Sequence, residues 1–140
     1  MKQIPVIFWT GTGNTQMMAD AVAEAINAAG AEAVVKNVSE ITADEAAGYD
    51  ALALGCPAMG AEVLEECEFE PFFTELEGKL AGKKVALFGS YGWGGSYMQD
   101  WEARVKDAGA TLVADGVLAL GAPDDEAVAK LAEAGKLLAK

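Results

Sequence analysis

Hydrophobic and polar positions follow two different periods along this chain. Short, nearly continuous apolar runs predict strands that are buried on both faces, and apolar residues three or four positions apart predict helices. The runs predict strands at 4–9, 33–38, 51–56, 84–90 and 111–120, the last one interrupted at Asp115. Helices are predicted at 15–29, at 71–80, at 97–108, and from Pro123-Asp124 to the end, with a short helix opened by the capping box Thr42–Glu45.

Strands and helices therefore alternate through the whole chain. Such alternation predicts a doubly wound α/β fold, with a parallel sheet between two layers of helices. We expect residues 1–140 to form a single domain. Right-handed crossovers would place the carboxyl ends of the strands along one edge of the sheet, where α/β proteins bind their ligands.

The first predicted strand ends in a loop rich in hydroxyl groups and glycine. Its residues are Thr10, Gly11, Thr12, Gly13, Asn14 and Thr15. Free backbone N–H groups at a helix start, together with the helix dipole, favour an anion there. The loop lacks the Lys of a nucleotide-hydrolase P-loop. It also lacks the third glycine of the dinucleotide-binding motif G-x-G-x-x-G, because Gln16 stands at that position. We interpret it as a neutral cradle for one phosphate that is bound and not cleaved; a plain β–α turn with polar capping residues is the alternative.

The charge of the chain narrows its classes of partner. The formal net charge is −12, which argues against nucleic acid and against an anionic membrane, and suits a basic protein partner. The same charge could serve solubility alone. No apolar run is long enough to span a membrane, and no signal peptide is recognised, so we expect a cytoplasmic protein.

The residue types present also limit the chemistry. The chain has no His, which excludes His-based acid–base catalysis and His metal ligands. Cys56 and Cys67 have neither C-x-x-C nor zinc spacing, and we expect two reduced, buried thiols. We therefore assign no catalytic residue and no metal ligand.

Two further loops follow predicted strands and should meet the first one at the same sheet edge. One contains Met59 and Glu62, and the other contains Tyr91 and Trp93 among glycines. Met59 and Trp93 could enclose a planar heterocycle whose phosphate reaches the first loop, and Glu62 could accept a hydrogen bond from a ring N–H. Each residue also has a simpler explanation: Met59 could fill the core, and Glu62 could be surface charge. Trp9 and Trp101 are expected in the core.

Three motifs in this order closely resemble those of short-chain flavodoxins from clostridia and related anaerobes. They are Trp9-Thr10-Gly11-Thr12-Gly13-Asn14-Thr15, Leu54-Gly55-Cys56-Pro57-Ala58-Met59-Gly60 and Leu87-Phe88-Gly89-Ser90-Tyr91-Gly92-Trp93-Gly94. The resemblance covers essentially the whole chain. It implies a three-layer fold with a five-stranded parallel sheet in the order 2-1-3-4-5, and non-covalently bound FMN. It also implies a low-potential one-electron carrier that is not an enzyme, shuttles mainly between semiquinone and hydroquinone, and acts as a monomer between redox partner proteins of the ferredoxin type.

The resemblance also implies a role for each site residue. Residues 10–15 and Ser90 would hold the phosphate. Met59 and Trp93 would pack on the two flavin faces, Glu62 would accept from N3–H, and Gly60 would accept from the protonated N5 on reduction. Pro57 and Ala58 complete the second loop, while backbone N–H groups near Tyr91, Gly92 and Gly94 would meet the pyrimidine oxygens.

Seven glutamates follow the second loop without an intervening Lys or Arg: Glu62, Glu65, Glu66, Glu68, Glu70, Glu75 and Glu77. Repulsion between these carboxylates and the negatively charged, fully reduced flavin should lower the midpoint potential of the second one-electron step. The same carboxylates should attract basic redox partners to the flavin edge. A solvated acidic helix face without a redox role is the alternative. The alternative function is a flavodoxin-fold NAD(P)H:quinone or nitro reductase, although such enzymes usually carry insertions that 140 residues leave no room for.

Overall fold

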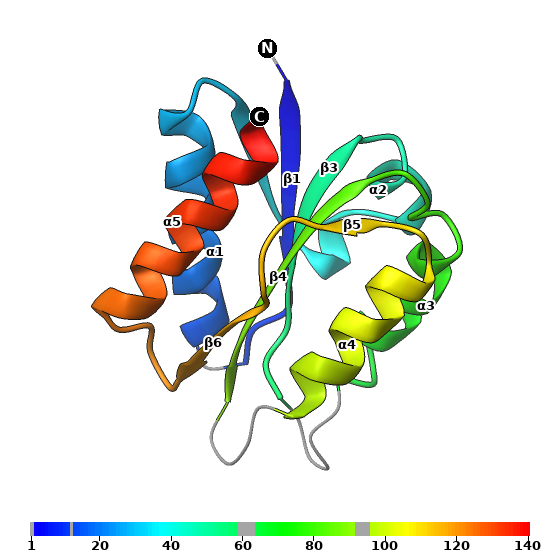
Figure 1. The fold of residues 1–140 in the computed structure, drawn as a ribbon. Helices are drawn as coiled ribbons and strands as arrows, with labels where there is room; N and C mark the ends of the chain where they lie inside the picture. Colours follow the sequence, from blue (N-terminus) through cyan, green and yellow to red (C-terminus); the bar gives the residue numbers. More distant parts are fainter. Residues whose placement is uncertain (1, 12, 59–63, 92–95) are drawn as a thin grey trace.

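The computed structural model describes residues 2–11, 13–58, 64–91 and 96–140. In it, a parallel sheet has the order β2-β1-β3-β4-β5, and β6 also pairs with β4 (Figure 1). The strands are β1 (Gln3–Phe8), β2 (Glu32–Asn37), β3 (Ala51–Gly55), β4 (Lys84–Tyr91), β5 (Thr111–Leu112) and β6 (Val117–Leu120). This order confirms the predicted doubly wound sheet.

Helices cover both faces of the sheet. They are α1 (Asn14–Ala28), the 3₁₀ turn η1 (Val38–Glu40), α2 (Ala43–Ala46), α3 (Phe69–Glu77), α4 (Ser96–Asp107) and α5 (Asp125–Ala139). Helices α1 and α5 lie side by side on one face, and α3 and α4 lie on the other (Figure 1). No helix in the described part of the chain is long and apolar enough to cross a membrane.

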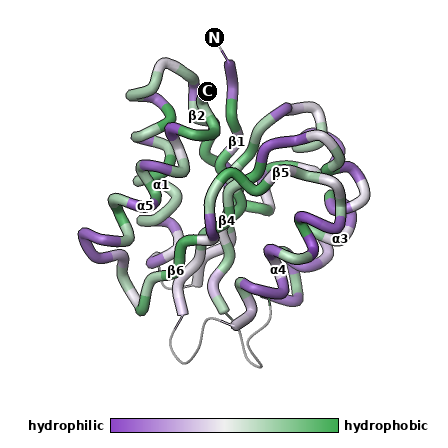
Figure 2. The backbone as a smooth tube through the Cα atoms, in the orientation of Figure 1, coloured by the Kyte–Doolittle hydropathy of each residue, from purple (hydrophilic) through white to green (hydrophobic). Residues whose placement is uncertain are grey.

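The sheet separates two hydrophobic clusters because successive strand residues point to opposite faces. Ile4, Val6 and Phe8 of β1 belong to the cluster under α1 and α5, whereas Ile7 belongs to the cluster under α3 and α4. All four are at most 5% exposed. In Figure 2 hydrophobic residues predominate along β1 and β4, and many residues of α4 are hydrophilic. The expectation of a strand buried on both faces is confirmed for β1.

The last strand is divided, as its sequence predicts. The early part of β4 pairs with β5, through Lys84 and Val85, and its end pairs with β6, from Phe88 to Tyr91. The two short strands therefore share one position at the edge of the sheet.

The bounds of α3 differ from the predicted 71–80, while its proline lies in the first turn as expected. Helix α3 begins at Phe69 and not at Pro71, so the proline is the third residue of the helix. A proline is tolerated there because the first N–H groups of a helix have no intrahelical acceptor.

Two tryptophans were expected in the core, and they differ. Trp101 is 1% exposed and meets Phe69 and Phe73 edge to face, at ring-centroid distances of 5.5 and 5.9 Å. Trp9 is only half-buried; it packs against the same cluster, and its Nε1–H donates to Glu68 Oε1 over 3.4 Å. The expectation is therefore confirmed for Trp101 and only partly for Trp9.

Candidate functional site at the carboxyl edge of the sheet

The first loop joins β1 to α1 through a left-handed turn. Gly13 has φ +93°, a conformation that residues with a Cβ rarely adopt. Its N–H donates to Thr10 Oγ1 over 2.9 Å, which closes the turn. Thr10, Gly11, Gly13 and Asn14 all lie at this junction, while Thr12 lies outside the described residues.

The start of α1 is left without a side-chain cap. The N-cap is Gly13, no side-chain capping bond is found there within the described residues, and the first helical turn has no acidic residue. The first intrahelical bond runs from Met17 N–H to Gly13 C=O over 3.1 Å. The N–H groups of residues 14–16 thus precede the helical ladder and, with the helix dipole, favour an anion.

A buried pair of hydroxyls connects this helix start to β4. Thr15 Oγ1 and Ser90 Oγ lie 3.3 Å apart, and the two residues are 1% and 7% exposed. They are 75 positions apart in the sequence. The predicted convergence of the first loop with the end of β4 is therefore confirmed.

The second loop meets the same serine. Ala58 N–H donates to the Ser90 carbonyl over 2.9 Å, and Pro57 precedes it as a half-buried residue. The next strand residue, Tyr91, is also half-buried, and its carbonyl accepts from Gly121 N–H over 3.1 Å. Ser90 of β4 thus contacts both the start of α1 and the segment that follows β3.

Several predicted site residues lie outside the described part of the chain. They are Thr12, Met59, Gly60, Glu62, Gly92, Trp93 and Gly94. Their proposed contacts with a flavin stay predictions.

The donor set at the first loop fits a phosphate monoester. It consists of neutral hydroxyls and backbone N–H groups at an uncapped helix start, with no carboxylate in the first turn to compete for them. A phosphate with a charge of about −2 would gain from both features. The residues present therefore suit the phosphate of FMN.

The acidic run after the second loop divides into two groups. Glu65 is 5% exposed, and its carboxylate accepts from the N–H groups of Cys67, Glu68 and Phe69 at 2.7–2.9 Å. Burial raises the pKa of Glu65. Together, these backbone donors lower it by more than burial raises it, so the pKa lies below its usual range. Glu65 therefore caps the start of α3, and it is not surface charge.

Two other glutamates are paired with an arginine. Arg104 on α4 binds Glu70 and Glu77 on α3 at 2.7–3.1 Å, and its guanidinium lies 4.7 Å from the centroid of the Phe73 ring. The hydrogen bond from Arg104 is the main cause that lowers the pKa of Glu70. No Lys or Arg intervenes in the sequence between these glutamates, but an arginine distant in sequence reaches two of them and offsets part of their charge.

The two thiols differ from expectation in one respect. Both cysteines are free, but Cys67 is exposed and only Cys56 is buried. Burial is the main cause that raises the pKa of Cys56, to about 12. Its Sγ accepts from Glu65 N–H over 3.3 Å. The thiol of Cys56 is thus a neutral structural group.

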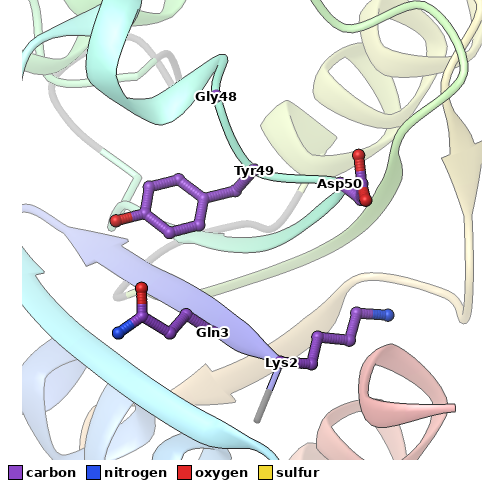
Figure 3. A pocket seen from close by; sticks show the side chains of 5 residues that line it. All are labelled: Lys2, Gln3, Gly48, Tyr49 and Asp50. Carbon is purple, nitrogen blue, oxygen red and sulfur yellow. The ribbon is translucent and has the colours of Figure 1, made fainter.

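A cavity at the opposite edge of the sheet is not part of this site. The cavity has a volume of about 350 Å³. Figure 3 shows the residues that line it, which are Lys2, Gln3, Gly48, Tyr49 and Asp50. They lie at the amino ends of β1 and β3, while the first loop follows the carboxyl end of β1. The length of a strand separates the two places.

Sequence reasoning missed three residues that fix this edge of the sheet: Cys56, Glu65 and Tyr97. The Tyr97 hydroxyl donates to the Cys56 carbonyl over 2.7 Å. The only sequence signal was indirect, because Tyr97 stands in the first turn of a helix that follows a glycine-rich loop.

Comparison with known proteins supports the site and the fold together. The family model described as flavodoxin matches residues 6–135. A flavodoxin of Clostridium beijerinckii is 47% identical over 135 residues, covering 96% of this chain and 97% of the relative. A flavodoxin of Megasphaera elsdenii is 47% identical over 116 residues, covering 82% and 85%.

A solved structure agrees with these matches. The solution structure of two-electron reduced Megasphaera elsdenii flavodoxin superposes with a TM-score of 0.89 at 43% identity, covering 97% of this chain and 98% of that one. The chain therefore belongs to the flavodoxin family, it is an FMN-based electron carrier, and FMN is its cofactor.

Proposed function

We propose that the chain holds FMN at the carboxyl edge of its sheet, with the phosphate on the first loop and the flavin ring between the second and third loops. The proposed site comprises Thr10, Gly11, Thr12, Gly13, Asn14, Thr15, Pro57, Ala58, Met59, Gly60, Glu62, Ser90, Tyr91, Gly92, Trp93 and Gly94. The observation that carries the proposal is the uncapped start of α1 beside the buried Thr15–Ser90 hydroxyl pair.

The phosphate would lie on the N–H groups that precede the helical ladder of α1. Each of the Thr15 and Ser90 hydroxyls has one O–H; while one of them donates to the other, the remaining O–H is available to the phosphate. Since no cation takes part among the described residues of the loop, the affinity depends on geometry and on the helix dipole.

The flavin supplies one-electron chemistry, and the protein sets its two potentials. Met59 and Trp93 would cover the two ring faces and exclude water. Glu62 would accept from N3–H, and the Gly60 carbonyl would hold a proton at N5. These four roles follow from the family resemblance and from the position of the loops after β3 and β4.

We propose that this carrier works mainly on the second, lower of the two one-electron steps. Exposed carboxylates of Glu66, Glu68 and Glu75 follow the second loop, and their negative charge would oppose a second electron on the flavin. The same carboxylates would attract ferredoxin-type partners with a basic surface. Glu65, Glu70 and Glu77 contribute less to that attraction, because the first is buried and the other two are paired with Arg104.

The molecule would act as a monomeric, single-domain carrier in the cytoplasm and not as an enzyme. Two free thiols support a reducing compartment, since thiols in an oxidising compartment commonly form disulfides. The family match over residues 6–135 supports one domain.

Titration of the apoprotein with FMN, followed by stepwise anaerobic reduction, tests this function. We expect tight binding and two separate one-electron steps. Ser90→Ala should weaken FMN binding about fivefold, the equivalent of one hydrogen bond of about 1 kcal/mol. Ser39→Ala is the control, because Ser39 is exposed in η1.

Two outcomes would contradict the proposal. An unchanged FMN affinity in Ser90→Ala would remove this hydroxyl from the phosphate site. Reduction in one two-electron step, with NADPH turnover on a quinone, would show a reductase and not a carrier.

A further inference from the structure

A tyrosine outside the proposed cofactor contacts joins two sides of the site. Tyr97 stands in the first turn of α4, is 2% exposed, and its hydroxyl donates to the Cys56 carbonyl over 2.7 Å. Its ring stacks on Trp101, with centroids 6.4 Å apart and an interplanar angle of 25°. The ring is thus held in the core, and the hydroxyl is aimed at the residue directly after β3.

The neighbouring strand leaves space for this hydrogen bond. A Cβ at Gly89 of β4 would lie 2.0 Å from the Tyr97 hydroxyl oxygen and 2.1 Å from the Cys56 carbonyl oxygen. Any side chain at that position would displace one of the two partners. Strands β3 and β4 and helix α4 therefore meet at one buried hydrogen bond.

Cys56 makes two further contacts that bear on the second loop. Its N–H donates to the Phe88 carbonyl over 3.1 Å, which continues the pairing with β4. Its Sγ accepts from Glu65 N–H over 3.3 Å. Cys56 precedes the second loop and Glu65 lies after it, so one residue fixes both ends of the segment that carries Pro57 and Ala58.

Tyr97 thereby connects the second loop to the third. It comes two positions after residues 92–95, and it is bonded to the residue that fixes the second loop. Under the proposed function, these two loops cover opposite faces of the flavin. A hydrogen bond between their bases sets the relative position of their ends.

We propose that Tyr97 is a positioning residue for the redox potentials of the cofactor, acting through Cys56. This inference rests on the proposed arrangement of the flavin between the second and third loops. The strength of a hydrogen bond to the flavin depends on distance and angle. A change in the spacing of the loop ends should therefore alter FMN binding unequally in its different redox states.

Tyr97→Phe tests the inference, because it removes one oxygen and keeps the ring on Trp101. We expect about a fivefold change in the ratio of FMN dissociation constants between two successive redox states. At 59 mV per tenfold for one electron, this corresponds to a shift of about 40 mV in one midpoint potential. Tyr49→Phe is the matched control, since Tyr49 lies at the opposite edge of the sheet.

A structural role alone would give a different result. In that case Tyr97→Phe would lower the melting temperature of the apoprotein and leave both potentials equal to those of Tyr49→Phe, which would overturn the inference. Failure of the wild-type protein to bind FMN would instead refute the proposed function, and the inference with it.

A second variant keeps the test decisive if Tyr97→Phe does not fold. Cys56→Ala removes the acceptor of Glu65 N–H and leaves the backbone carbonyl in place. We expect it to shift a midpoint potential as well, and an unchanged pair of potentials would count against the coupling through Cys56. Cys67→Ala is its control, because that thiol is exposed.

Discussion

Helices α1 and α5 start at the same edge of the sheet, yet their first turns differ in chemistry. At α5, the Asp124 carboxylate accepts from Ala127 N–H over 2.8 Å, and Asp125 and Glu126 add negative charge to the first turn. At α1, glycine is the N-cap and no acid follows in the first turn. A helix that caps itself is stable without a ligand, whereas one that leaves its first N–H groups uncapped offers them to an anion.

A third helix start lies between these two cases. Helix α3 has no capping bond from its own N-cap, Glu68, but the buried Glu65 carboxylate binds its first N–H groups from three residues earlier. A negative group from the protein there fills the place that we assign to the phosphate at α1. Among the described residues, a carboxylate of the protein binds the first N–H groups of α5 and of α3, and none binds those of α1, where we propose the phosphate.

The largest effect should come from making α1 resemble α5. Asn14→Asp places a carboxylate in the first turn of α1. It should stabilise the apoprotein by about 0.5 kcal/mol, and it should weaken FMN binding roughly 30-fold, or about 2 kcal/mol, through repulsion of the phosphate. Apoprotein melting and FMN titration measure the two effects. A variant that is more stable and also binds FMN more tightly, or that is less stable and also binds FMN more weakly, would contradict the comparison.

Glu65→Gln should remove the internal anion at α3. We expect a loss of about 1.5 kcal/mol of stability at neutral pH, because hydrogen bonds to a charged acceptor are stronger than those to an amide. The pKa of Glu65 is lowered in the folded protein, so its contribution is present above the unfolded value, about 4.5, and is lost as the pH falls through the folded value.

Denaturant unfolding at several pH values measures this dependence. The difference between wild type and Glu65→Gln should be constant near neutral pH and should shrink below about pH 4. The exposed Glu66→Gln is the matched control and should change stability by less than about 0.5 kcal/mol. A difference that grows on acidification would be inconsistent with an ionised cap.

Asp124→Ala should destabilise α5 by about 1 kcal/mol, the usual effect of losing an N-cap side chain. FMN affinity should stay within twofold of wild type, because this helix end is closed by the protein itself. Urea unfolding and FMN titration give both numbers. A large loss of FMN affinity would place α5 in the cofactor site.

The smallest expected effect concerns the exposed carboxylates beside the second loop. Combined Glu66→Gln and Glu75→Gln should raise the second midpoint potential by about 20 mV at low salt, with most of the effect lost near 1 M salt. Asp20→Asn and Glu24→Gln on α1 remove the same charge from the other face of the sheet and serve as the control. Equal shifts of the second midpoint potential in both double variants would show that the shift depends on net charge and not on the position of the carboxylates.

The sequence predicted the sheet and the meeting of its loops because both depend on local patterns and on the handedness of the crossovers. Apolar runs defined β1, β3 and β4, and the order of elements placed their carboxyl ends together. The division of the last strand at Asp115 could also be predicted, since a short polar interruption is visible in the chain itself.

The roles of individual acidic residues could not be predicted in this way. Glu65 and Glu66 are neighbours of identical type, but only Glu65 points its carboxylate to the start of α3. Glu70 and Glu77 are bound by Arg104, which lies 34 and 27 positions later. Such contacts depend on how α3 packs against α4, and a linear pattern does not encode that packing.

The central claim, that the uncapped start of α1 binds the phosphate of FMN, is tested most directly with riboflavin, which lacks the phosphate. Dissociation constants of FMN and riboflavin are measured for wild type and Asn14→Asp under the same salt. We predict that wild type binds FMN far more tightly than riboflavin, and that Asn14→Asp weakens FMN binding roughly 30-fold while leaving riboflavin within twofold. Equal losses for both ligands, or none for either, would contradict the claim.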